Sequence, residues 1–300
     1  MQGTRGAAAP LPAVLAAFAV IYLVWGTTYL ANRFIVEALP PLLARAGCCL
    51  AAGAVLFAAA RLGGAPAPGA SEWRAATLTG SLLFAGCQGL LSLAQQHVAS
   101  GLAALVIATI PLWIPLLNWM APGGQAPGRV VFGSAALGLS GVAVLVGGAG
   151  AVGGMSLGWG AALVLSALSW SAGTVVSRRL PRPASPWLGA GMGLLAGGAV
   201  LVLLGAAAGE AAAPWPEEVP PVVWGALAYT VFGNYLLAFG CYVWLLDTRP
   251  AERVATYAYV NPLVAVTLDW LVAGEPLTGG AGLAALLIVG AVAVAVSRPA

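Results

Sequence analysis

The chain has 300 residues, of which 61% are hydrophobic and only 7% are charged. A soluble globular domain carries about 25% charged residues, so this composition excludes a water-soluble fold and indicates a membrane protein. The formal net charge of +3 comes from arginines that are scattered along the chain. Because they form no basic run with interleaved aromatic rings, we expect no nucleic-acid partner.

Ten apolar segments follow one another along the sequence, each close to the roughly 20 residues that a helix needs to cross about 30 Å of hydrocarbon. They span residues 11–31, 39–60, 75–97, 100–120, 129–149, 157–177, 187–208, 221–246, 251–273 and 278–297. Short connections rich in Pro and Gly separate them. We therefore expect an all-α integral membrane protein with ten transmembrane helices.

Landmarks of the first half return in the same order in the second half. The pairs are Trp25 and Trp170, Pro41 and Pro186, Pro111 and Pro262, and Asn118-Trp119 and Asp269-Trp270. Because each copy holds an odd number of segments, the second copy enters the membrane from the opposite face, as in transporters built from inverted repeats. We expect two five-helix repeats, residues 1–150 and residues 151–300, around a central cavity.

The arginines predict the orientation of the chain. With both termini in the cytoplasm, every arginine except Arg33 and Arg45 falls on the cytoplasmic side. Positively charged residues are enriched on that side of membrane proteins, so we expect both termini to be cytoplasmic.

The first and sixth segments carry Trp25 and Trp170 at equivalent positions, deeper than the interface where tryptophan usually anchors a helix. We expect substrate contact there. Neither segment contains an Asp or Glu, so a mechanism in which a cationic drug and a proton compete for one deep carboxylate is disfavoured.

Two charges lie near the outer ends of their segments, Arg45 in the second and Asp269 in the ninth. One interpretation is that each side chain extends to the membrane surface. The other is that the two interact as an extracellular gate in one conformational state, or that Arg45 meets a substrate carboxylate. The sequence leaves these alternatives open.

The third and eighth segments are equivalent in the two repeats, and both carry polar or aromatic groups on one face. Tyr235, Phe239 and Tyr242 recur at i, i+4 and i+7 of the eighth segment, and Gln88 lies in the third. We expect these four side chains to contact the substrate. The alternative for the aromatic stripe is core packing.

In the ninth segment, Tyr257 and Asn261 are four residues apart and share one helical face, and the repeat makes it equivalent to the face of the fourth segment that carries Trp113. Each segment also contains a proline, Pro111 or Pro262, that removes a helical hydrogen bond and permits a kink. We expect the three side chains to line the pathway and the prolines to act as hinges. Hydrogen bonding between helices is the alternative for Tyr257 and Asn261.

Several of these features occur together in one known family. They are a Trp in the first helix, Pro-Leu-Leu-Ala-Arg at residues 41–45, a proline within the fourth helix, and Gly-Glu-Pro-Leu-Thr at residues 274–278. The chain resembles the ten-helix EamA branch of the drug/metabolite transporter superfamily, and within it the bacterial amino-acid exporters. The first repeat departs from the pattern, because Gly124 stands where the second has Glu275. The resemblance implies a multi-pass protein of the bacterial inner membrane that exports small metabolites by alternating access.

Rings, amides and hydroxyls without a deep acid favour a neutral or zwitterionic solute, above all an aromatic or other apolar amino acid. The alternatives are a drug or another metabolite, such as a sugar conjugate or lipid-linked precursor, and a non-transporting structural membrane protein. An enzyme is not expected, because no nucleophile and base lie together at depth. Neither a Walker motif nor metal-type cysteine spacing is present, so we expect no cofactor or metal. The expected partners are a small-molecule substrate and the lipid bilayer, and the sequence leaves proton coupling and the oligomeric state open.

Overall fold

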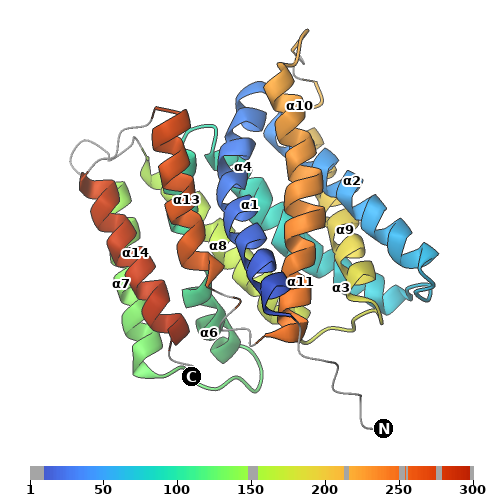
Figure 1. Ribbon diagram of the computed structural model, residues 1–300, viewed down its shortest axis with the longest axis horizontal. Helices are drawn as coiled ribbons and strands as arrows, with labels where there is room; N and C mark the ends of the chain where they lie inside the picture. The colour runs from blue at the N-terminus through green and yellow to red at the C-terminus, as the bar shows by residue number, and fades with distance from the viewer. Residues whose placement is uncertain are drawn as a thin grey trace.

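The protein is a bundle of helices, some of which cross the others obliquely (Figure 1). The computed structural model describes residues 10–147, 155–212, 216–249, 254, 256–274 and 279–297, and within these ranges it contains no strand. The first half holds α1 (Leu11–Ala38), α2 (Pro41–Leu62), α3 (Ala70–Gly80), the π-helix η1 (Ser81–Gly89), α4 (Leu90–Ala94), α5 (Ser100–Ile107), α6 (Ile110–Met120) and α7 (Arg129–Gly147). The second half holds α8 (Leu157–Ser177), α9 (Pro186–Ala207), α10 (Pro221–Ala228), the π-helix η3 (Tyr229–Ala238), α11 (Phe239–Thr248), α13 (Tyr257–Val272) and α14 (Gly279–Ser297).

Seven helical segments in the described part of the chain are long and apolar enough to cross a membrane. They are Leu11–Ala38, Pro41–Leu62, Ala70–Ala94, Ser100–Met120, Leu157–Ser177, Pro186–Ala207 and Pro221–Leu245. Three shorter apolar stretches lie within α7, α13 and α14. The all-helical membrane fold expected from the composition is therefore confirmed.

The first helix is longer than predicted, because it continues past residue 31 to Ala38. Arg33 and Glu37 lie one turn apart in this extension, with 2.8 Å between Nε and Oε1, so its polar side chains support the helix. The helix ends where Pro40 disfavours a helical backbone at Leu39.

Two helices are interrupted at equivalent places of the two halves. The π-helix η1 lies between α3 and α4, and the π-helix η3 lies between α10 and α11. Each adds a local widening of the turn, a feature that often occurs at functional sites. In the fourth predicted segment, the helix instead breaks between α5 and α6, just before Pro111.

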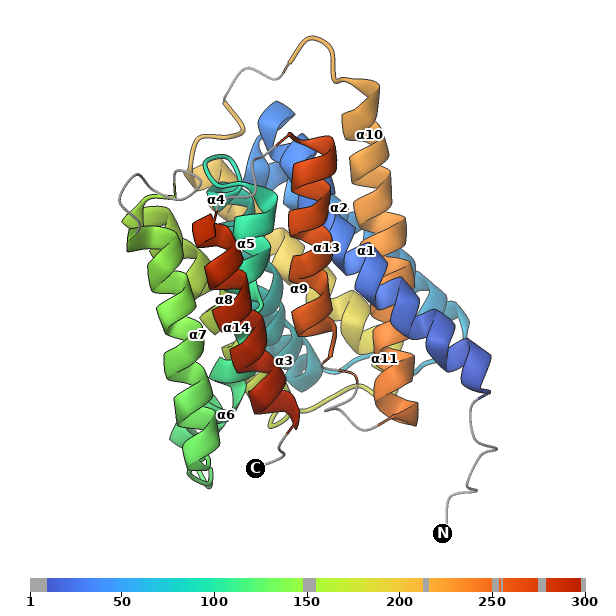
Figure 2. The same cartoon turned by 60° about the vertical axis from the view of Figure 1, so that its left-hand side comes forward.

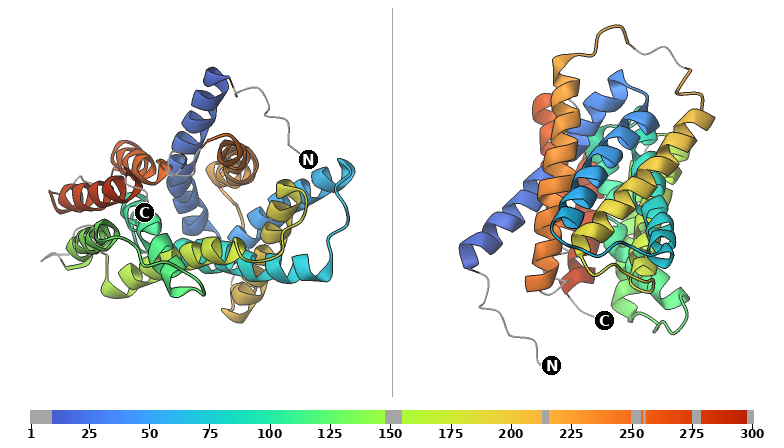
Figure 3. Two further views of the ribbon diagram at one scale, coloured as in Figure 1. Left: turned by 90° about the horizontal axis from the view of Figure 1, so that it is seen from below. Right: turned by 90° about the vertical axis from the view of Figure 1, so that its right-hand side faces the viewer.

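Contacts between the halves follow a symmetric pattern. α2 packs along α9 and α7 along α14, while α1 lies against α13 and η3, and α8 lies against α6 and η1. Viewed along the bundle in Figure 3, α7 and α14 form one side, and α2, α3 and α9 form the other. The start of α1 and the end of α14 lie at the same end of the bundle (Figure 2).

Candidate functional site

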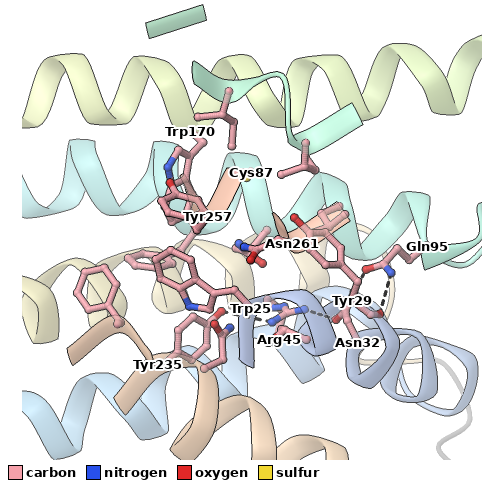
Figure 4. A pocket seen from close by; sticks show the side chains of 18 residues that line it. Trp25, Tyr29, Asn32, Arg45, Cys87, Gln95, Trp170, Tyr235, Tyr257 and Asn261 are labelled. Atoms are coloured by element: carbon pink, nitrogen blue, oxygen red, sulfur yellow. Dashed lines mark hydrogen bonds between the residues drawn. The ribbon is translucent and has the colours of Figure 1, made fainter. Parts of the chain in front are cut away.

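A cavity of about 100 Å³ lies between the halves at the level of η1 and η3, and side chains from both halves line it (Figure 4). The first half contributes Trp25, Thr28, Tyr29, Asn32, Arg45, Phe84, Cys87, Gln88, Leu91, Gln95, Ile107 and Ile110. The second half contributes Trp170, Asn234, Tyr235, Phe239, Tyr257 and Asn261. The helices α7 and α14 contribute none, so they lie outside the site.

Most of the side chains that the sequence predicted as substrate-binding share this cavity. Those lining it are Trp25, Gln88, Trp170, Tyr235, Phe239, Tyr257 and Asn261. Trp113 and Tyr242 do not. Their roles in binding stay predictions, and the structure supplies the geometry on which the predictions depend.

Trp113 and Tyr242 are displaced from the cavity for different reasons. The indole Nε1 of Trp113 donates to Thr109 Oγ1 at 3.1 Å, which turns the ring back along its own helix. Tyr242 packs behind the lining rings, with centroid distances of 5.2 Å to Trp25 and 5.9 Å to Tyr257. Tyr242 therefore supports the site from behind.

The lining rings hold one another edge to face. Trp25 and Tyr257 lie 4.8 Å apart at an interplanar angle of 83°. Phe84 contacts Trp170 at 6.4 Å and 87°, and Tyr235 at 6.0 Å and 86°. Edge-to-face pairs are favoured by the ring quadrupole. Each pair joins one half to the other, so an apolar wall spans the interface between the halves.

A polar network forms the other part of the wall, and Figure 4 shows part of it as dashed lines. Asn32 Nδ2 donates to Gln95 Oε1 at 2.6 Å, and Gln95 Nε2 donates to the carbonyl of Tyr29 at 2.9 Å. Arg45 donates from Nη2 to Asn32 Oδ1 and from Nη1 to Tyr235 Oη, the latter at 3.4 Å. The network thus connects α1, α2, α4 and η3 around one guanidinium.

The sequence prediction named Trp25 but missed the other cavity residues of α1. Trp25, Thr28, Tyr29 and Asn32 are spaced i, i+3, i+4 and i+7, which places them on one side of a helix. The predicted first segment ended at residue 31 and so left out Asn32, whereas Thr28 and Tyr29 lay within it and were not singled out. The spacing itself carried the signal.

Arg45 is positioned by the start of α2. The helix begins at Pro41, and its first free amides, Leu42 N–H and Leu43 N–H, donate to the two carboxylate oxygens of Glu210 at 3.2 and 2.9 Å. A carboxylate at a helix N-terminus satisfies these donors and complements the helix dipole. Arg45 follows in the next turn with only 2% of its surface exposed.

Asp269 lies at a different place from Arg45. It is 4% exposed, and its carboxylate accepts hydrogen bonds from Ser100 Oγ and from the backbone N–H of Gly101 at the start of α5. Each charge has its own partners, so the predicted gate pair is not formed in this structure. Because both side chains are buried, the alternative in which they extend to the membrane surface is wrong. The gate itself stays a prediction.

The two prolines expected to act as hinges lie at different places in their helices. Pro111 lies in the first turn of α6, directly after the break from α5, and Pro262 lies inside α13. Residues 275–278, which contain Glu275, lie outside the described residues.

Comparisons with known proteins agree with this architecture. The pattern of the EamA-like transporter family matches residues 11–147 and again residues 158–297. The chain is 36% identical to the uncharacterized inner membrane transporter YedA of Escherichia coli K12 over 284 residues, which are 94% of this chain and 90% of YedA. It is 28% identical to the uncharacterized transporter YvbV of Bacillus subtilis over 92% of this chain and 88% of YvbV. The fold also matches that of a crystal structure whose sequence is 26% identical, with a TM-score of 0.62. The match covers 95% of this chain and 97% of the chain in the crystal structure.

Proposed function

The chain belongs to the EamA-like transporter family, and from this premise we propose that it is a secondary transporter that exports small neutral or zwitterionic metabolites. The class that the cavity fits best is aromatic or other apolar amino acids. Because its relative YedA is an inner membrane transporter and its own helices are of transmembrane length, the chain is a multi-pass protein of the bacterial inner membrane.

For the architecture, we propose ten spans arranged as two inverted five-helix repeats with both termini in the cytoplasm. The family pattern occurs twice, which supports the duplication. The equivalent placement of η1 and η3 supports the relation between the halves. Arg61, Arg129 and Arg178, at the ends of α2, α7 and α8, fall on the side that the positive-inside rule assigns to the cytoplasm.

The observation that carries the proposed substrate class is the division of the cavity wall into rings and polar groups. Rings bind an apolar side chain through dispersion and stacking, whereas amides, hydroxyls and a guanidinium bind the polar head of an amino acid. No carboxylate is among the lining residues, so the cavity offers a cation no charged partner. This favours a zwitterion over a cationic drug.

Transport would proceed by exposing this cavity alternately to the two sides of the membrane. The helix break before Pro111, the proline within α13 and the two π-helices all lie in spans that line the cavity. Breaks and π-turns are weak points of a helical hydrogen-bond ladder, so bending concentrates there. These positions are our proposed hinges.

Uptake into proteoliposomes tests the proposed function. Purified protein should move radiolabelled phenylalanine, tyrosine, leucine and valine faster than protein-free liposomes do, and unlabelled members of the panel should compete. If folded protein neither moves nor binds any of them, the amino-acid assignment is wrong. Repeating the assay with and without a pH gradient measures proton coupling.

A further inference from the structure

We propose that Arg45 binds the carboxylate of the transported solute, so that an acidic head group is a requirement of the site. This inference rests on the proposed function, because it places a substrate in the central cavity. It deepens that function by naming the group that the protein recognises and the residue that recognises it.

The first argument is the charge balance around Arg45. The guanidinium is buried at 2% exposure, and the acceptors that it contacts are the neutral oxygens of Ser92, Asn32 and Tyr235. Among the described residues, the ion pair found is between Arg33 and Glu37, and no acidic side chain lies within pairing distance of Arg45. An arginine keeps its charge in proteins, and a buried charge without a counter-ion is costly. A solute carboxylate supplies that counter-ion.

The second argument is the donor count. A guanidinium has five N–H donors. Arg45 uses one from Nε to Ser92, one from Nη1 to Tyr235 and one from Nη2 to Asn32. One N–H on each of the two Nη atoms therefore has no acceptor within the described part of the chain. Two such groups on adjacent nitrogens match the two oxygens of a carboxylate.

Tyr235 provides a further donor at the same place. Its Oη accepts from Arg45 and from Cys49 Sγ, each at 3.4 Å. Because the oxygen already accepts twice, its own O–H remains to donate. The phenol and the guanidinium thus form one donor cluster at the cavity wall.

The third argument is the position of this cluster relative to the rings. Figure 4 shows Arg45, Trp25 and Asn261 around the same space, with Trp170 on the far side. A carboxylate held by Arg45 leaves the remainder of an amino acid to extend toward the aromatic wall. The arrangement predicts that acids and zwitterions bind, that their amides bind weakly, and that amines without a carboxylate do not bind.

The test compares three ligands of nearly equal size in calorimetric titrations of purified full-length protein. They are L-phenylalanine, 3-phenylpropionate, and 3-phenylpropionamide, which replaces the carboxylate by a neutral amide. Wild-type protein should bind the acid at least tenfold more tightly than the amide. Equal affinity for the acid and the amide, or no binding of any of the three, would overturn the inference without any variant.

Variants then locate the effect. Arg45→Gln should weaken phenylpropionate roughly ten- to a hundredfold and leave the amide unchanged, because one charged hydrogen-bonded contact is lost. Arg45→Lys should retain part of the affinity. Arg61→Gln is the matched control, because Arg61 is exposed in the last turn of the same helix. The Arg61→Gln protein should bind all three ligands as tightly as wild type does. If Arg45→Gln does not fold, the comparison of 3-phenylpropionate with 3-phenylpropionamide on wild-type protein is by itself the test of the inference.

The outcomes also separate this inference from the proposed function. If phenylpropionate binding depends on Arg45 but phenylalanine is not transported, the carboxylate site is supported and the proposed amino-acid transport is contradicted. If wild type and folded Arg45→Gln transport phenylalanine with the same KM, the proposed amino-acid transport is supported and the carboxylate site at Arg45 is contradicted.

Discussion

At the scale of single residues, the cavity combines an aromatic wall and a polar wall. Rings from both halves hold one another edge to face, and a single guanidinium sits among neutral amides and hydroxyls. Polar groups in the membrane interior are costly and are usually turned toward protein or water. Their concentration at one cavity indicates a binding surface.

Replacement of Trp170 by leucine tests the aromatic wall. Trp170→Leu removes one partner of Phe84 and one ring face of the cavity. Because an aromatic pair contributes about 0.5–1.5 kcal/mol beyond area burial, KM for phenylalanine should rise by about two- to tenfold. The KM for valine should change less, because its side chain has no ring to stack. Trp119→Leu, which changes an exposed ring outside the cavity, should have no effect on either value.

Asp269 gives a prediction about stability. Asp269→Asn replaces the carboxylate by a neutral amide, whose oxygen can still accept from Gly101 N–H and whose NH2 can donate to Ser100 Oγ, so both hydrogen bonds remain but lose their charge assistance. The loss should lower the free energy of unfolding by about 1–3 kcal/mol, and thermal unfolding in detergent measures it. Glu37→Gln breaks a pair that is half exposed and should cost less than about 0.5 kcal/mol. Equal unfolding temperatures for the two variants would contradict this assignment.

Helical spacing was sufficient to predict some cavity residues and insufficient for others. Tyr257 and Asn261 were placed on one face by their separation of one turn, and both line the cavity. Trp113 was placed by transfer between the repeats, but its side chain follows a local hydrogen bond to Thr109 that no spacing rule contains. Tyr242 satisfies the spacing rule and still lies behind the lining rings, because periodicity gives a helix face but not a depth.

At the scale of helices, close packing between the halves depends on glycines. A Cβ atom at Gly80, the last residue of α3, would lie 2.2 Å from the carbonyl oxygen of Gly193 on α9. Small residues allow membrane helices to approach at such distances. The α3–η1 span is thereby held against α9, with its cavity face turned inward.

Substitution of Gly80 by alanine tests this contact. Gly80→Ala forces α3 and α9 apart and should destabilise the protein by about 1–3 kcal/mol, as overpacking does in other interiors. Gly47→Ala is the matched control, because a Cβ at Gly47 would meet no atom within 4 Å. Thermal unfolding should show a lower midpoint for the first variant and an unchanged or higher midpoint for the second. A midpoint at Gly80→Ala as high as that of wild type would show that the helices do not touch there.

Apolar length was enough to predict most helices, and the exceptions have local causes. The bounds predicted for α8 agree with the structure at both ends, since apolar residues fill it from Leu157 onward. The extension of α1 to Ala38 was missed, because its polar side chains pair with each other instead of ending the helix. The π-helices were also missed. Hydrophobic period does not distinguish a π-turn from an α-turn over so few residues.

At the scale of the whole molecule, the proposed topology assigns one end of the bundle to the cytoplasm and the other end to the outside of the cell. Residue Ala67 lies between α2 and α3, and Glu217 lies just before α10, at the opposite end of the bundle in Figure 1. With cytoplasmic termini, Ala67 faces the cytoplasm and Glu217 faces the outside.

Cysteine labelling in intact cells tests this orientation. A membrane-impermeant maleimide should label Glu217→Cys directly and Ala67→Cys only after the membrane is permeabilised. The native cysteines give little background, because Cys48, Cys49 and Cys87 are buried and Cys241 is half-buried. The reverse pattern of labelling would show that the orientation is inverted.

The central claim is that one cavity between the halves carries the solute across the membrane. Counterflow measures this most directly, because labelled solute that has entered must compete with the excess of unlabelled internal solute for the same site before it can leave. Proteoliposomes loaded with unlabelled phenylalanine should transiently accumulate external labelled phenylalanine above its equilibrium level. Uptake that is no faster in loaded than in empty proteoliposomes, and no faster than in protein-free liposomes, would contradict the account.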